Sequence, residues 1–198
     1  MSASRTDFAS VLGEHIAVAS ALAGDPGLIA SIEDAARLTE RAISGGNKLL
    51  LCGNGGSAAD CQHIAAELVG KFYFHRRSLP AEALTTNTSA LTAIGNDYSY
   101  EEVFSRQLEG VGRSGDVLLG ISTSGRSKNV LQAFATAKSM GIATIMLTGS
   151  ALEGAAVPHC DLLISVPSKV TPRIQEAHMF ILHIWAEQIE NILTKGSE

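Results

Sequence analysis

Three loops rich in glycine and hydroxyl residues each follow an apolar run: LLLCGNGGSA, VLLGISTSGRS and TIMLTGSALEG. In the second loop, Ser122, Thr123, Ser124 and Ser127 lie within six residues, immediately before a helical pattern. Hydroxyls and the unpaired N–H groups of a helix N-terminus suit a phosphate dianion. The helix dipole alone supplies only about 0.3–2 kcal/mol, so several hydrogen bonds must add to it. The same residue types also make ordinary turns and caps, but four clustered hydroxyls favour a phosphate site.

The first loop, GNGGSAAD, resembles the start of three phosphate-binding designs. A P-loop is excluded because no Lys follows the glycines at the required offset. Gly53, Gly55 and Ala58 fit the dinucleotide fingerprint, but no acidic residue follows about 20 positions on to hold a ribose. Arg76 and Arg77 stand there instead and could meet a 2′-phosphate, although the second strand of that fold is missing. We therefore expect the loop to contribute to a phosphate site together with the other two loops.

Acid–base residues occur at helical spacing in two separate segments. His63 and Glu67 are four residues apart, on one face of a helix, and Asp60 precedes them by one turn. Gln175 and His183 are eight apart, about two turns, on neighbouring sides of a second helix. The two segments together offer a mixed N/O donor set for zinc or a similar divalent ion. A His and a Glu at this spacing are more often a plain surface pair, so the residues alone leave both interpretations open.

The elements that must position these residues alternate between strand and helix, which predicts a parallel α/β sheet with right-handed crossovers. Ligands of such sheets bind beyond the carboxyl ends of the strands, where the three loops lie. We expect strands at 48–53, 79–84, 116–122, 143–149 and 161–166, and helices at 57–72, 87–96, 99–111, 129–141 and from about residue 172.

Residues 6–45 precede the first strand and read as two helices. Asp25 is a candidate N-cap of the second helix, Pro26 its first residue, and Gly45-Gly46 its stop. These helices have no obvious partner within one sheet layer, so we expect them to pack against another subunit. We predict one domain over 1–198, in which a helical pair (1–45) precedes the α/β core with its C-terminal helix (46–198).

Composition narrows the class of protein. The chain has 198 residues and 15 basic against 20 acidic side chains, a net charge of -5, which disfavours nucleic-acid binding. No apolar stretch approaches the roughly 20 residues that cross a membrane. Three cysteines, an odd number without tight spacing, fit a reducing compartment, with Cys52 expected as a buried thiol. We expect a cytoplasmic protein that neither enters a membrane nor binds nucleic acid.

Four motifs in this order, GNGGSAAD, AIGND, STSGRS and IQEAHMFILH, resemble the sugar isomerase (SIS) domain, in its phosphoheptose isomerase branch. The resemblance covers nearly the whole chain from about Asp25. It implies a single SIS domain with a doubly wound, flavodoxin-like parallel sheet of five strands flanked by helices. It also implies conversion of sedoheptulose 7-phosphate to D-glycero-D-manno-heptose 7-phosphate, the first step toward ADP- or GDP-heptose and lipopolysaccharide. Cytoplasmic homotetramers with active sites between subunits are implied as well.

The same resemblance assigns roles to individual residues. It implies that Glu67 and His183 are the catalytic acid–base pair. The implied metal ligands, for one zinc ion per site, are His63, Glu67, Gln175 and His183. The implied substrate contacts are Asn54, Gly55, Gly56, Ser57, Glu67, Asn96, Asp97, Ser122, Thr123, Ser124, Ser127 and Gln175. His178 lies off the His183 face and is expected to be structural or interfacial, while Asp60 is either a partner of His63 or an ordinary helix acid.

Two alternatives stay open from the sequence. Relatives within the family act as regulators without catalysis, including an initiator-associating protein with a similar tetramer. Retention of both Glu67 and His183 favours the enzyme over such a scaffold. The other alternative is an isomerase of a different sugar phosphate, which chain length cannot exclude.

Overall fold

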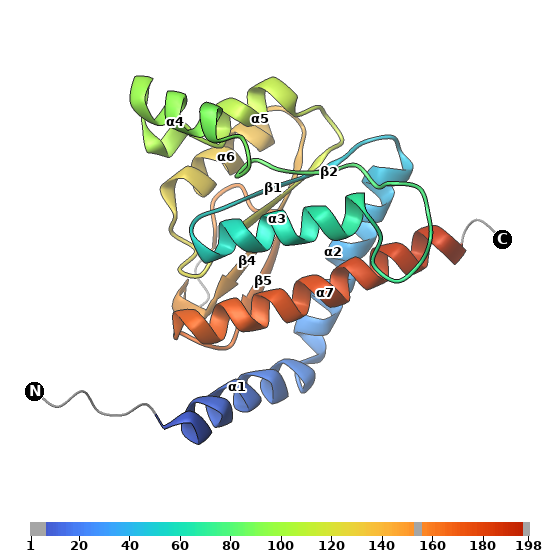
Figure 1. Ribbon diagram of the computed structural model, residues 1–198, viewed down its shortest axis with the longest axis vertical. Coiled ribbons are helices and arrows are strands. Elements are labelled where there is room, and N and C mark those ends of the chain that lie inside the picture. The colour runs from blue at the N-terminus through green and yellow to red at the C-terminus, as the bar shows by residue number, and fades with distance from the viewer. Residues whose placement is uncertain (1–6, 153–155, 196–198) are drawn as a thin grey trace, which may run out of the picture.

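A parallel sheet forms the centre of the computed structural model, which describes residues 7–152 and 156–195 (Figure 1). Its strands within those ranges are ordered β2-β1-β3-β4-β5. They comprise β1 (Leu49–Gly53), β2 (Ala81–Ala83), β3 (Val117–Ser122), β4 (Ala143–Gly149) and β5 (Leu162–Val166). All five residues of β1 and all six of β3 are buried, as expected where helices cover both faces of a parallel sheet. The five expected strands and the α/β class are confirmed.

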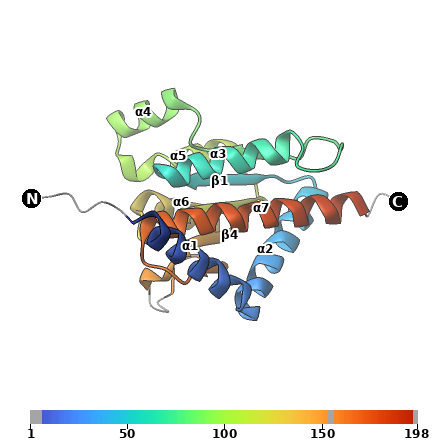
Figure 2. The ribbon, with the colours of Figure 1, turned by 60° about the horizontal axis from the view of Figure 1, so that its bottom comes forward.

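Helices cover the two faces of the sheet in separate groups (Figures 1 and 2). One hydrophobic cluster joins the sheet to α2 (Pro26–Ser44), α3 (Gly56–Val69) and α7 (Thr171–Lys195). A second cluster joins the opposite face to α5 (Ser105–Val111) and α6 (Lys128–Ser139) and borders α4 (Thr88–Asp97). Neighbouring positions on a strand face opposite sides, so Leu51 belongs to the first cluster and Cys52 to the second. Cys52 is fully buried, as the sequence predicts.

The boundaries of α2 follow from its terminal residues. Asp25 is the N-cap, and its Oδ1 accepts hydrogen bonds from the N–H groups of Gly27 and Leu28, each at 3.0 Å. Pro26 occupies the first turn, where no N–H is needed, and Gly45 ends the helix. The cap and stop predicted for this helix are therefore confirmed.

The prediction of one helix over 99–111 is wrong. A 3₁₀ turn, η1 (Tyr100–Glu102), is followed by a break at Val103–Phe104 and then by α5. Both residues of the break are buried in the core, and Gln107 Nε2 donates to the carbonyls of Val103 and Leu84. The apolar spacing suits either one helix or two short ones, and the docking of this segment against the core decides between them.

The helix predicted over 57–72 is instead Gly56–Val69, one residue earlier at its start and three residues shorter at its end. Gly70 follows its last turn and donates its N–H to the carbonyl of Ala66. Glycine is common at this position because it tolerates backbone conformations that end a helix. The residues beyond it leave the helix axis and form a loop that returns toward β2.

Helix α1 (Phe8–Ala23) lies apart from the sheet, against the start of α7 (Figure 2). Leu22 is its buried residue, whereas Phe8, Leu12 and Ile16 are 81%, 48% and 55% exposed. A hydrogen bond of 2.8 Å between His15 Nδ1 and a carboxylate oxygen of Glu176 attaches it to α7. Packing of this apolar face against another subunit stays a prediction.

Within the described ranges, no single helix is long and apolar enough to cross a membrane, whereas α1 and α2 taken together pass that test with a 76° bend between them.

His178 is fully buried on α7, where its ring lies against the backbone of Thr148 at the end of β4. Burial penalises the charged ring more than this backbone stabilises it, and so lowers the pKa of His178 to about 4. The unfolded chain therefore binds more protons than the folded chain between about pH 6.5 and pH 4.

We expect acidification from pH 7 to pH 4 to remove up to roughly 3 kcal/mol of unfolding free energy through His178 alone. Urea unfolding at several pH values, compared between wild type and His178→Gln, measures this contribution. The variant should lose that part of the pH dependence. An unchanged pH dependence would contradict the assignment.

Candidate active site

The glycine loop (GNGGSAAD, residues 53–60) and the hydroxyl loop (residues 122–127) lie side by side because β1 and β3 are neighbours in the sheet. Gly55 has φ +56°, in the left-handed region that favours glycine, and its carbonyl accepts the N–H groups of Ala58 and Ala59. Ser57, in the first turn of α3, is buried. Two helix N-termini, those of α3 and α6, therefore begin at this edge of the sheet, with their N–H groups available to an anion.

Two of the predicted phosphate hydroxyls meet directly. Ser122 Oγ and Ser127 Oγ are 2.9 Å apart, and Ser127 is the N-cap of α6 without a side-chain capping bond. Ser124 Oγ accepts the N–H of Arg126 at 3.2 Å. Thr123 is held through its carbonyl, which accepts the N–H of Gly149 at 3.1 Å. The hydroxyl loop is thus fixed by its own hydrogen bonds and by β4.

Asn129 and Tyr100 belong to this site although the sequence did not indicate them. Asn54 and Asn129 exchange amide hydrogen bonds of 2.9 and 2.8 Å across the two loops, and Asn129 is buried. The Tyr100 hydroxyl donates to Asn54 Oδ1 at 3.1 Å. This triad joins the glycine loop, α6 and η1. The sequence did contain one signal for Asn129: it lies two residues after Ser127, in the first turn of the helix that follows the hydroxyl loop.

Asn96 and Asp97 lie at the end of α4, on the exposed side of that helix. Asn96 Nδ2 donates to Asp97 Oδ1 at 2.8 Å. Their segment reaches the glycine loop through Tyr100, three residues further on. The structure therefore places the pair on the segment that borders the site, with both side chains open to solvent.

His63, Glu67 and His183 come together from two helices. The Nε2 atoms of His63 and His183 are 3.0 Å apart, and Glu67 Oε1 lies 3.4 Å from His63 Nε2. The side chains of His63 and Glu67 are 45% and 28% exposed, so a substrate can reach them. The ring of Phe72 lies 5.7 Å from that of His183, centroid to centroid.

Gln175 lies at the glycine loop, apart from the His63–His183 pair. A Cβ built on Gly56 would be 2.3 Å from Gln175 Nε2, so the amide occupies the space that a side chain would need. The contacts of α3 with α7 thus follow the same order on both helices: Gly56 with Gln175, then His63 with His183. The two helices run side by side in the same direction (Figure 1).

Two of the four predicted ligands, His63 and His183, have the spacing that a divalent ion requires. Two imidazole nitrogens of a tetrahedral zinc site are about 3.3 Å apart, because each Zn–N bond is about 2.0–2.1 Å. The Nε2 atoms of His63 and His183 are 3.0 Å apart, with the Glu67 carboxylate beside them. Among the described residues, however, no group of three or more His, Cys, Asp or Glu side chains is placed so that it could hold a metal ion. Gln175, the fourth predicted ligand, lies against Gly56.

Asp60 lies one turn before His63 on α3 and is half-buried. Burial raises the pKa of its carboxyl to about 6, and the charge of His63 opposes that rise. Its Oδ2 atom is buried without a hydrogen-bond partner among the residues that the structure describes. The carboxyl group is therefore an electrostatic neighbour of His63.

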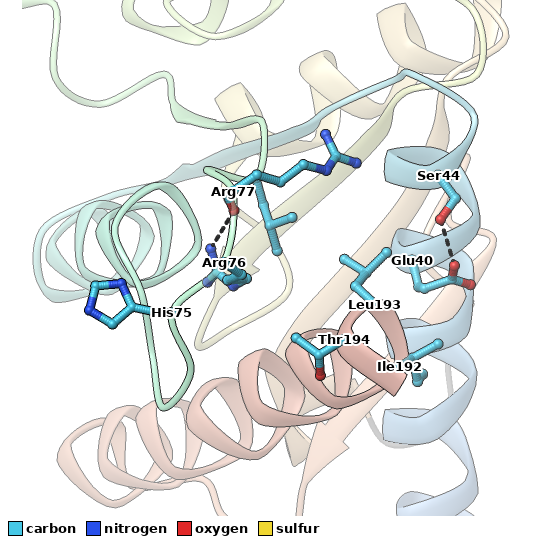
Figure 3. Close-up of a pocket in the computed structure, with 9 residues that line it drawn as sticks. Glu40, Ser44, His75, Arg76, Arg77, Ile192, Leu193 and Thr194 are labelled. Atoms are coloured by element: carbon cyan, nitrogen blue, oxygen red, sulfur yellow. Dashed lines mark hydrogen bonds between the residues drawn. The ribbon is translucent and has the colours of Figure 1, made fainter. Parts of the chain in front are cut away.

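A separate cavity of about 750 Å³ lies at the other end of α7 (Figure 3). It is lined by Glu40, Ser44, His75, Arg76, Arg77, Leu79, Ile192, Leu193 and Thr194. None of the predicted site residues is among these, and the hydroxyl loop lies at the opposite end of the helix. The chemistry of the molecule is therefore assigned to the strand ends and not to this cavity.

Comparison with known families gives one match that spans most of this architecture, a model described as the SIS domain, over residues 25–149. The chain belongs to the SIS domain family. The matched region begins at the N-cap of α2 and ends with β4, so it includes the glycine loop, the hydroxyl loop, His63 and Glu67.

Similar proteins of known name identify the branch of the family. The chain is 55% identical over 163 residues to a phosphoheptose isomerase of Sulfurimonas denitrificans, covering 82% of this chain and 83% of the relative. It is 52% identical over 187 residues to the phosphoheptose isomerase of Aneurinibacillus thermoaerophilus, covering 94% of both. A solved phosphoheptose isomerase structure from Neisseria gonorrhoeae superposes with a TM-score of 0.82 at 41% identity, covering 92% of this chain and 96% of that chain. The expected family and fold are confirmed.

Proposed function

We propose that the chain is an aldose–ketose isomerase that converts sedoheptulose 7-phosphate to D-glycero-D-manno-heptose 7-phosphate in heptose biosynthesis. The relatives named phosphoheptose isomerase, about half identical over most of the chain, support this function. The observation that carries it is the meeting of Glu67, His63 and His183, on α7 and on the helix α3 that begins at the glycine loop. A base, an acid and an anion site are the three parts that this reaction needs.

Proton transfer between C1 and C2 is assigned to Glu67. Its carboxylate removes a proton from C1 of the ketose, the C1–C2 double bond of an enediol forms, and the C2 carbonyl oxygen takes a proton from His183. Glu67 then gives a proton to C2, while the C1 hydroxyl gives its proton to His183 and becomes the aldehyde. A positioned acid–base residue contributes about 10²–10⁴-fold to such a step.

The phosphate site is assigned the role of fixing the position of the substrate relative to Glu67. The hydroxyls of Ser122, Thr123, Ser124 and Ser127 and the N–H groups of the two helix N-termini hold the phosphate dianion. Glu67 and Gln175 face the sugar from their own helices, and Asn96 with Asp97 binds its hydroxyls from the segment of α4. Holding one end of a flexible sugar phosphate keeps C1 and C2 within reach of the base.

We also propose one zinc ion, held by His63, Glu67, Gln175 and His183 after the side chains of Glu67 and Gln175 rotate toward the imidazoles. When bound, the ion supplies Lewis-acid stabilisation of negative charge on substrate oxygens. A carboxylate bound to zinc is a weaker base, so Glu67 serves the ion and the proton at different moments.

Removal of metal with a chelator is expected to lower turnover of sedoheptulose 7-phosphate by at least about tenfold, with recovery on adding zinc. Metal content per chain, measured before and after dialysis, is compared between wild type and His63→Ala. The variant is expected to retain less zinc at equal folding. Full turnover by metal-free protein would remove zinc from the proposal and leave Glu67 and His183 in place.

We further propose a homotetramer whose active sites lie at subunit interfaces. Exposed apolar side chains on α1 (Phe8, Leu12 and Ile16) and Phe180 on α7 support burial against other copies. The open position of Asn96 and Asp97 also suits a site that a neighbouring copy completes. Sedimentation of wild type and of Leu12→Glu with Ile16→Glu tests this, because two charges on that face should separate the copies.

The proposed function is tested by turnover of sedoheptulose 7-phosphate, with fructose 6-phosphate as a shorter substrate of the same chemistry. We expect the seven-carbon substrate to be preferred. A folded protein that isomerises neither sugar would contradict the enzyme assignment and favour a regulatory SIS protein.

A further inference from the structure

Arg76 binds the end of the helix that carries Glu67. Its guanidinium donates to the carbonyls of Glu67 and Leu68 at 3.0 and 2.8 Å, and more weakly to that of Gly70 at 3.4 Å. The last carbonyls of a helix have no partner within it, and a cation there also complements the helix dipole. The side chain is only 6% exposed. Arg76 is thus a C-terminal cap of α3, supplied by a residue that lies beyond the helix.

Glu190 on α7 binds the other side of the same guanidinium. Arg76 Nε donates to Glu190 Oε1 at 2.8 Å, and both side chains are buried. The N–H groups of Phe72, Tyr73 and Phe74 also donate to this carboxylate, at 3.2, 2.6 and 3.2 Å. Burial acts to raise the pKa of Glu190, but these backbone N–H groups and the charge of Arg76 outweigh it, so the pKa is lowered.

The pair therefore joins the two helices that carry the acid–base residues. Arg76 is bonded to the main chain of Glu67 itself, and Glu190 follows His183 by seven residues, about 10 Å along the axis. Glu190 also fixes Phe72, whose ring lies against that of His183. Figure 3 shows Arg76 at this end of the two helices, beside Arg77 and the last turns of α7.

We propose that Arg76 and Glu190 are positioning residues, which set the distance between Glu67 on α3 and His183 on α7. This inference rests on the proposed isomerase function. The pair touches no side chain of the predicted site, and its influence passes through the main chain of Glu67 and through Phe72. A fork of donors is required, because one guanidinium must reach the carbonyls of α3 and the carboxylate of α7 together.

Two substitutions test separately the negative charge of Glu190 and the planar set of donors on the Arg76 guanidinium. Glu190→Gln keeps the shape but removes the carboxylate, while Arg76→Lys keeps the charge and replaces the planar fork by a single ammonium. For both variants we expect kcat to fall about 10- to 100-fold with KM within about twofold, because a shift near 1 Å in a reacting group has an effect of that size. If Glu190→Gln fails to fold, Arg76→Lys alone tests the positioning role.

Asp116 provides the matched control. It is also buried, and it accepts hydrogen bonds from Lys48 Nζ, Lys48 N and Arg113 N at 2.8, 2.9 and 2.8 Å. It precedes β3, at the amino ends of the strands and away from the site. Asp116→Asn should lower the melting temperature as Glu190→Gln does and leave kcat unchanged. Equal losses of kcat in the two variants, or none in Glu190→Gln and Arg76→Lys, would overturn the inference.

A second readout does not depend on turnover. The imidazole nitrogen NMR signals of His63 and His183 report the contact between their Nε2 atoms. We expect Glu190→Gln and Arg76→Lys to shift both signals and Asp116→Asn to leave them in place. An inactive wild type would refute the proposed function, whereas unshifted signals in both variants would refute the positioning role.

Discussion

Glu67→Gln is expected to lower kcat for sedoheptulose 7-phosphate by about 10²–10⁴-fold, since the amide cannot accept the C1 proton. The substitution keeps the size of the side chain and its place on α3, 3.4 Å from His63 Nε2 in the wild type. The hydroxyl loop is not altered, so KM should change much less than kcat. Steady-state kinetics on the purified variant measures both constants.

Glu109→Gln is the control for this substitution. Glu109 is an exposed carboxylate on α5, and it lies outside the predicted site. The control should retain wild-type kcat and KM. If Glu67→Gln also kept wild-type kcat, a different residue would have to move the proton, and the role of Glu67 would be refuted.

Ser122→Ala combined with Ser127→Ala is expected to give the largest loss of substrate affinity. Each hydroxyl that donates to a charged phosphate contributes about 1.5–3 kcal/mol, or roughly 10- to 150-fold in binding. The two oxygens lie 2.9 Å apart in the structure, so they would share one phosphate and their effects need not add. KM for the sugar phosphate and the inhibition constant of inorganic phosphate should both rise.

Ser139→Ala controls for loss of a hydroxyl on the same helix. Ser139 lies at the opposite end of α6, where its Oγ donates to the carbonyl of Thr136 at 2.8 Å. We expect its KM to match that of the wild type. A double variant with unchanged KM and unchanged phosphate inhibition would place the anion elsewhere.

Much of the fold was predictable because three of the strands have a clear local signal in the sequence. The runs that became β1, β3 and β4 are continuous and apolar, as buried parallel strands must be. The order β2-β1-β3-β4-β5 then brings the glycine and hydroxyl loops to one edge. The spacing of His63 and Glu67 placed them on one face of α3, and the structure shows them together.

The missing parts depend on contacts between segments far apart in the sequence. Glu190 lies in the last third of α7, and its donors at 72–76 are more than a hundred residues away in the sequence. The spacing of residues within either segment therefore does not predict their contact. The position of Gln175 beside Gly56 likewise follows from how α7 docks along α3, which the eight-residue interval to His183 does not determine. The break at Val103–Phe104 has the same origin, because burial of these residues decides it.

The most direct test of the central claim is turnover of sedoheptulose 7-phosphate in D₂O, followed by NMR. The Glu67 side chain is 28% exposed, so the proton that it takes from C1 exchanges with solvent before a proton is given to C2. The account therefore predicts an aldoheptose 7-phosphate that carries solvent deuterium at C2. The rate of its formation should fall with Glu67→Gln. No aldose product from folded wild-type protein, or a product without deuterium at C2, would contradict the account.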